Sequence, residues 1–136
     1  MGRGKRRVAY AALAMAMGAF WLAASTPIVE SPRNARPGLW EVSHRATGAA
    51  AERVCLADPM ILTQWEHRGQ ACTRVIISEQ GAAAKVHYTC AGGGFGQSEI
   101  TLLTPRSLRV DTQGISGGWP FAYSIHARRA GNCPGR

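Results

Sequence analysis

The residues of this chain whose chemistry could support catalysis or metal binding are one patterned serine, four cysteines and four histidines. Gly114 to Gly118 satisfies the Gly-x-Ser-x-Gly pattern, in which the nucleophilic serine needs a strand before it and a helix after it. Here Trp119-Pro120 follows at once and a strand is predicted from Phe121, so Ser116 is expected in a glycine-rich loop. We therefore expect no catalytic residue and no enzyme activity. A small envelope hydrolase that uses Ser116 or a histidine is the alternative.

The cysteines lie too far apart for a zinc site, because their spacings of 17, 18 and 43 positions contain no Cys-x-x-Cys pair. In an exported chain an even number of cysteines indicates disulfides, and four cysteines permit three connectivities. We expect Cys55 to bond Cys72, which would clamp the intervening helix over a sheet. We expect Cys90 to bond Cys133, which would tie the C-terminal tail to the sheet.

The four histidines never fall at the i, i+2 or i, i+4 spacing that would place two of them beside one metal ion. His87 and His126 both occupy outward positions of predicted strands and could meet across the sheet, but the simpler interpretation is a pair of solvated surface residues. His44 shares the inward phase of the first strand and is expected to be partly buried. Gly92 to Gly96 lacks the helix start and the lysine of a phosphate-binding loop, so no cofactor is expected.

The first 25 residues have the order of a secretory signal. Arg3, Lys5, Arg6 and Arg7 precede an uncharged apolar run from Val8 to Ala24, which ends in small residues. We predict a signal peptide over residues 1–25, cut after Ser25, and export to the periplasm. An uncleaved membrane anchor is the competing interpretation, because 17 apolar residues lie near the lower limit for a spanning helix.

Removal of this segment leaves a small domain with an ordinary charge. Four of the 16 basic residues leave with it, so the mature chain has a net charge of +4, and its arginines are mostly scattered singly. Nucleic-acid binding is therefore not expected. Residues 26–36, with Pro27 and Pro32 and no periodicity, are expected to form a linker. Residues 37–134 are long enough for a single domain.

Alternating hydrophobicity predicts that this domain is mostly β. Two strands flank the glycines at 92–94: Val86, Tyr88 and Cys90 share one face of the first, and Ile100 and Leu102 share one face of the second. Further strands are expected at 39–45, 52–55, 72–79, 106–113 and 120–129. Gln80-Gly81 is expected to form the turn that connects the strand at 72–79 to a central strand at 84–90. Asp58 and Pro59 suit the start of one short helix, with Ile61, Leu62 and Trp65 on its buried face. The predicted fold is an antiparallel meander or partial barrel of about seven strands.

Two aromatic residues are the candidate binding residues. Phe95 and Trp119 each follow a glycine-rich turn, and exposed aromatics beside such turns can bind a protein or an apolar ligand. The competing interpretation for Trp119, favoured by the frequency with which large aromatics are buried, is that it folds back and plugs one end of the sheet.

Short motifs at the two ends of the domain carry a resemblance to a known family. Pro37-Gly38-Leu39-Trp40-Glu41 opens the folded part and Arg129-Ala130-Gly131-Asn132-Cys133-Pro134 closes it, with three cysteines between. In these features the chain resembles a proteobacterial family of small exported proteins of unknown function. The resemblance implies a periplasmic, disulfide-bonded, β-rich domain and brings no catalytic residues. The function expected is a non-enzymatic module that binds a protein partner or a small apolar ligand, with an envelope hydrolase or an enzyme inhibitor as alternatives.

Overall fold

The computed structural model describes residues 30–135 of the chain. The predicted signal peptide and the first residues of the predicted linker lie outside these described residues. The elements are η1 (Pro32–Asn34), β1 (Gly38–Ser43), β2 (Glu52–Leu56), η2 (Pro59–His67), β3 (Cys72–Gln80), β4 (Ala83–Cys90), β5 (Phe95–Thr104), β6 (Ser107–Ser116) and β7 (Trp119–Gly131).

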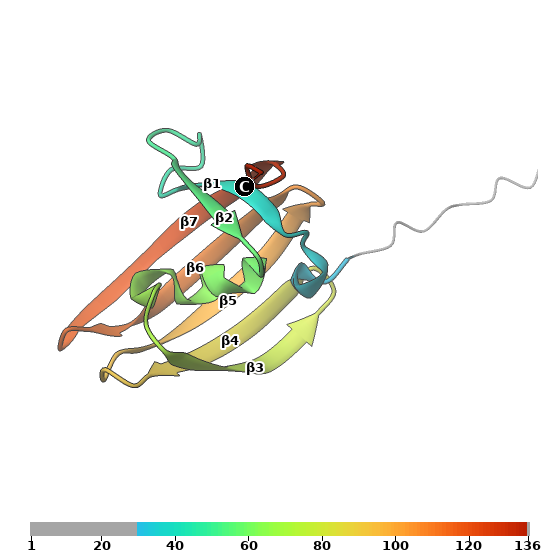
Figure 1. Cartoon of the computed structure of the whole chain (residues 1–136). Coiled ribbons are helices and arrows are strands. Elements are labelled where there is room, and N and C mark those ends of the chain that lie inside the picture. The colour runs from blue at the N-terminus through green and yellow to red at the C-terminus, as the bar shows by residue number, and fades with distance from the viewer. Residues whose placement is uncertain (1–29, 136) are drawn as a thin grey trace, which may run out of the picture.

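The strands form one seven-stranded antiparallel sheet in the order β2-β1-β7-β6-β5-β4-β3. Strands β3 to β7 follow one another as a meander, and β1 then pairs with β7 (Figure 1). The predicted meander is confirmed, but the sheet is not closed into a barrel, because β2 and β3 lie at its two opposite edges. The strand expected at the centre, β4, is second from an edge, and β6 occupies the middle.

One face of the sheet carries the hydrophobic core. The alternation of residues puts Tyr88 of β4, Ile100 of β5 and Val110 of β6 on this inner face, where all three are fully buried. Trp40 of β1 and Ile125 of β7 lie on the same face and extend this buried layer across the rest of the sheet. Burying this continuous row of apolar side chains is the main force that holds the five central strands together.

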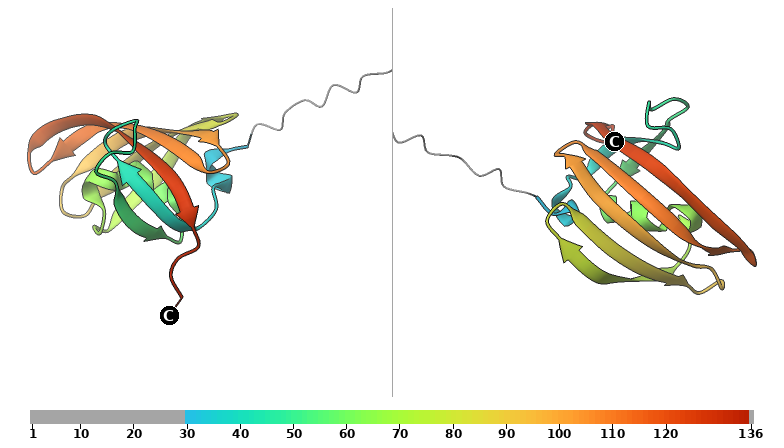
Figure 2. Two further views of the ribbon diagram at one scale, coloured as in Figure 1. Left: turned by 90° about the horizontal axis from the view of Figure 1, so that it is seen from above. Right: turned by 180° about the vertical axis from the view of Figure 1, so that it is seen from behind.

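The inner face is covered by η2, around which the sheet curves (Figures 1 and 2). Asp58 caps this helix by accepting a hydrogen bond from the Met60 N–H at 2.9 Å, and Pro59 begins it, as predicted. Leu62 and Trp65 are its buried apolar anchors, whereas Ile61 is only partly buried. The helix is of the 3₁₀ type, and non-helical backbone angles at Gln64 interrupt it.

Two local expectations are wrong. The segment before Pro37 was expected to be a linker without regular structure, but its η1 turn is capped by Ser31 and packs the side chains of Pro32 and Ala35 into the domain. His44 is exposed rather than partly buried, because β1 ends at Ser43 and the chain turns outward there.

The predicted disulfide pairing is also wrong. The bonds are Cys55–Cys133 and Cys72–Cys90. Cys55 lies on β2 and Cys72 on β3, at opposite edges of the sheet, so these two residues cannot meet. The β3–β4 hairpin instead sets Cys72 directly opposite Cys90, with their Cα atoms 3.9 Å apart. Cys133 reaches Cys55 because β7 returns beside β1, the neighbour of β2.

Candidate binding surface

The glycine-rich turn between β4 and β5 is shaped by the helix beneath it. A Cβ atom at Gly94 would overlap the imidazole of His67, and one at Gly96 would overlap the phenol of Tyr88. Gly93 has a φ of 97°, a conformation that favours glycine. Close packing on η2 therefore explains Gly94, close packing on Tyr88 of β4 explains Gly96, and the backbone conformation of the turn explains Gly93.

The neighbouring turn, between β6 and β7, presents Trp119 to solvent. Ser116 and Trp119 face each other across a two-residue turn in which Gly117 and Gly118 have φ angles of 57° and 83°, as tight hairpins require. The Trp119 side chain is 77% exposed, so it does not plug the end of the sheet. Ser116 is followed by this turn and then by β7, and so it lacks the helix that a nucleophile elbow needs.

Phe95 lies at the mouth of an apolar groove on the outer face of the sheet, which no helix covers when the sheet is viewed from behind (Figure 2). The register places Phe95, Ile115 and Pro120 in one row across β5, β6 and β7. The groove has a volume of about 540 Å³. Its lining residues are His87, Phe95, Gly96, Gln97, Gln113, Gly114, Ile115, Pro120, Phe121 and Ala122. Phe95 is 42% exposed, and Trp119 lies just outside the groove beside Pro120.

A polar groove of similar volume, about 540 Å³, continues from the apolar one toward the middle of the sheet. The two share Gln97, Gln113 and Ala122, and the polar groove adds the charged side chains of Lys85, Glu99 and Asp111. The outer face thus offers an apolar region near the hairpin turns and a charged region behind it.

Asp111 is the most constrained carboxylate of the polar groove. Its Oδ1 accepts hydrogen bonds from Arg109 Nη2 at 2.8 Å and from the Ser124 hydroxyl. Partial burial raises the pKa of Asp111, but these hydrogen bonds and the charges of Arg109 and His126 outweigh it and hold the pKa below its ordinary value. The carboxylate is therefore ionised at neutral pH, with its Oδ1 held by Arg109 and Ser124.

A buried polar cluster between η2 and the sheet is the part that sequence analysis missed. The Ser98 hydroxyl donates to the Thr63 carbonyl and lies 2.7 Å from the Thr112 hydroxyl. Nδ1 of His67 is 3.0 Å from the Tyr88 hydroxyl, and its Nε2, packed against Gly94, has no hydrogen-bond partner among the described residues. Ser98 and Thr112 could have been found, because both share the inward phase of their strands with Ile100 and Val110.

This cluster fastens the helix to the sheet, and one of its members, Thr112, also lines the polar groove. Burial and the negative charge of Glu66 raise the pKa of Tyr88 to about 12, although the Thr112 hydroxyl opposes the shift. Tyr88 therefore stays neutral at physiological pH. Nearby Tyr123 likewise has its pKa raised by burial and by Glu66. We assign these residues a structural role.

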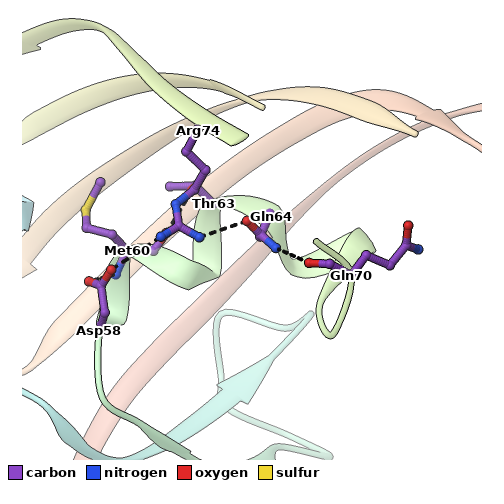
Figure 3. Close-up of polar contacts among 6 residues, drawn as sticks. All are labelled: Asp58, Met60, Thr63, Gln64, Gln70 and Arg74. Carbon is purple, nitrogen blue, oxygen red and sulfur yellow. Dashed lines mark hydrogen bonds and ion pairs between the residues drawn. The ribbon is translucent and has the colours of Figure 1, made fainter. Parts of the chain in front are cut away.

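A second set of polar contacts ties η2 to the edge strand β3 (Figure 3). Arg74 donates to Gln64 Oε1 at 2.8 Å and reaches Asp58 Oδ2 at 3.4 Å. Gln64, which is buried, donates in turn to the Gln70 carbonyl at 3.5 Å. One arginine from β3 thus bonds both the cap of the helix and its irregular centre.

The histidines do not form a common site. His87 and His126 point outward as predicted, but β5 and β6 lie between their strands, so they do not meet. His67 is buried under the β4–β5 turn. Within residues 30–135 no group of three or more His, Cys, Asp and Glu side chains is placed to hold a metal ion.

A curved antiparallel sheet, one covering helix and two disulfides define a small disulfide-bonded β domain, and such bonds are consistent with an exported protein. The chain belongs to the DUF3617 family of proteins of unknown function, whose sequence pattern matches residues 35–133. No curated protein and no solved structure matches the chain. None of the helices in the described part of the chain has the length and apolar composition needed to cross a membrane.

Proposed function

We propose that this domain is a non-enzymatic periplasmic module that binds a protein partner through its hairpin end. The binding surface comprises Phe95 and the apolar groove on the outer face, together with Trp119 at the hairpin tip, on the phase of β7 that it shares with Ile125. The observation that carries the proposal is the 77% exposure of Trp119 on a hairpin tip. A large aromatic side chain is seldom left in water without use, and tryptophan is the residue most enriched among the strongest contributors to protein interfaces.

The shape of the surface favours a protein partner over a small apolar ligand. A small apolar ligand is usually enclosed on most sides, whereas this groove lies open on a sheet face and Trp119 projects beyond it. Export is supported by the basic and apolar start of the chain and by the two disulfides. The absence of a helix after Ser116 supports the non-enzymatic assignment.

Capture from a periplasmic extract tests the proposal. The immobilised protein should retain a partner identified by mass spectrometry, and Trp119→Ala or Phe95→Ala should each reduce retention. Leu103→Ala is a matched control, because Leu103 is 56% exposed on the same strand as Phe95 but at the opposite end of the sheet. Equal capture by all three variants would contradict the proposed surface. A small molecule found by native mass spectrometry of the purified protein would favour ligand binding instead.

A further inference from the structure

The edge strand β3 carries an exposed apolar run that the proposed function leaves unused. It is nine residues long and pairs only with β4 among the described residues, forming the lower edge of the sheet in Figure 1. Val75, Ile76 and Ile77 at its centre are exposed, Val75 and Ile77 by 57% and 54%. A long edge of this kind is a template for pairing with another strand.

The backbone groups that face outward from β3 follow from the ladder with β4. The Ala91 N–H donates to the Ala71 carbonyl at 3.0 Å, so the next pair, Cys72 and Cys90, is a non-hydrogen-bonded pair, which fits their close Cα atoms. Alternation then turns the N–H and C=O of Arg74 and Ile76 away from β4. In β4 the odd-numbered residues, such as His87 and Lys85, are the ones whose backbone groups bond β3. Lys85 therefore bonds Ser78, and the backbone N–H and C=O of the next residue, Glu79, face the free edge.

A β-bulge at the middle of the strand restricts what can pair with it. The register shifts between Ile76 and Ser78, so Ile77 is an extra residue. Before the bulge, Arg74 points to the inner face and Val75 to the outer face; after it, Glu79 points inward and Ser78 outward. A regular strand would match one half of β3 and place its side chains on the wrong face in the other half.

A second copy of the same strand satisfies both halves. If two β3 strands run antiparallel with Ile76 and Ile77 at a two-fold axis, Arg74 faces Glu79 of the other copy and Val75 faces Ser78. In this register the two bulges lie opposite each other, and side chains of the inner face lie beside side chains of the inner face. The backbone N–H and C=O groups of Arg74 and Glu79, which face the free edge, then lie opposite each other and can form hydrogen bonds. The two charged pairs are of opposite sign, which stabilises directly opposed residues in a sheet.

We propose that the protein forms a homodimer in which β3 of each copy pairs antiparallel in this register, joining the two sheets edge to edge. Pairing covers the exposed Val-Ile-Ile run with the same run of the second copy. The interface lies on the edge of the sheet, four strands away from Trp119, and it comes next to the apolar groove only at Val75, which pairs with the lining residue His87.

Cysteine cross-linking of the purified protein tests the register. Val75→Cys mixed with Ser78→Cys should give a covalent dimer, because these residues form a non-hydrogen-bonded pair with Cβ atoms close enough to bridge. Either variant alone should give none, since its cysteines lie about 10 Å apart along the strands. Cross-linking of a single variant with itself, or none in the mixture, would overturn this register.

Light scattering tests the dimer itself. The mass should rise to twice the monomer mass as the protein concentration increases from about 1 to 100 μM. Ile76→Pro should remain monomeric and folded, because the N–H that it removes faces the edge and not β4. Arg74→Glu should weaken the dimer about tenfold, since it sets like charges opposite each other twice. A monomer at every concentration would overturn the proposal and leave the edge to a different strand.

Discussion

The two edges of the sheet are protected in different ways. β2 is five residues long, carries the charged side chains of Glu52 and Arg53, and is bonded to the C-terminal tail through Cys55–Cys133. β3 is nine residues long and exposes three β-branched residues, and its disulfide, Cys72–Cys90, joins it only to the neighbouring strand β4. Short, charged edges resist pairing with other strands, and long apolar edges invite it. The comparison indicates that β2 is an end of the domain and β3 an interface.

The disulfides show the same difference in their reach along the chain. Cys55–Cys133 spans 78 positions and connects β2 to the tail after β7, whereas Cys72–Cys90 spans 18 and reinforces a hairpin that its own turn already closes. In the chain-entropy description a longer loop gives the larger stabilisation. The β2 edge therefore depends on its covalent bond more than the β3 edge does.

The largest expected effect is the loss of the long-range disulfide. Replacing Cys55 and Cys133 by alanine should lower the free energy of unfolding by about 4.5 kcal/mol, and replacing Cys72 and Cys90 by about 3 kcal/mol, as loop length predicts. Urea unfolding monitored by tryptophan fluorescence measures both values, and amide exchange should become faster in β2 only for the first variant. Equal losses, or a larger loss for the hairpin bond, would show that the edges do not differ in this way.

The contrast between the edges also shows where sequence analysis succeeds. Alternation along β4 to β7 predicted which residues of each strand are buried, because a period of two is a local property that one burying face enforces. The same local reasoning found the cap at Asp58 and the exposed phase of His87 and His126. Phe95 and Trp119 both follow glycine-rich turns and both are exposed, but the favoured expectation for Trp119, that it folds back and plugs one end of the sheet, was wrong.

Which strands lie at the edges of the sheet is not a local property, and there the predictions failed. A run such as Val75-Ile76-Ile77 is typical of a buried strand, yet β3 is an edge, since only the return of β7 beside β1 decides which strands are left outside. The disulfide pairing depends on the same long-range order, so it failed with it. His67 was missed because its burial depends on the glycine turn that closes over η2.

A smaller effect is expected from the polar tie between β3 and the helix. Arg74→Met should lower the free energy of unfolding by about 1 to 2 kcal/mol, because it leaves the buried Gln64 carbonyl oxygen without its donor. The matched control on the other edge is Arg53→Met, which removes an exposed ion pair to Glu41 and should change stability by less than about 0.5 kcal/mol.

The measurement is chemical unfolding in the Ile76→Pro background, in which edge pairing does not contribute. Adding Gln64→Leu should reduce the effect of Arg74→Met, since the buried acceptor is then absent. If Arg53→Met is as destabilising as Arg74→Met, the tie seen in Figure 3 does not stabilise the β3 edge.

The smallest expected effect concerns the end of β3, where Glu79 meets η1. The Ser31 hydroxyl donates to the Glu79 carboxylate, and Arg33 Nη1 lies 3.4 Å from its other oxygen. The hydrogen bond from Ser31 is the largest influence, and with Arg33 it holds the pKa of Glu79 below its ordinary value although slight burial acts in the opposite direction. Because the folded pKa is the lower one, this contact stabilises the fold above the unfolded pKa of about 4.3 and is lost as the pH falls through the folded pKa.

Carbon-detected NMR titration of the Glu79 carboxyl group in the Ile76→Pro variant should therefore show a midpoint below about 4.3, and Ser31→Ala should raise that midpoint. Asp111 is the comparison group, because the contacts that lower its pKa do not include Ser31, and its midpoint should not move with Ser31→Ala. In the dimeric protein Arg74 of the second copy lies opposite Glu79, so the midpoint should fall further than in the Ile76→Pro variant. A midpoint that is the same in both proteins would mean that no positive charge meets Glu79 across the edge, and would count against the proposed register as well.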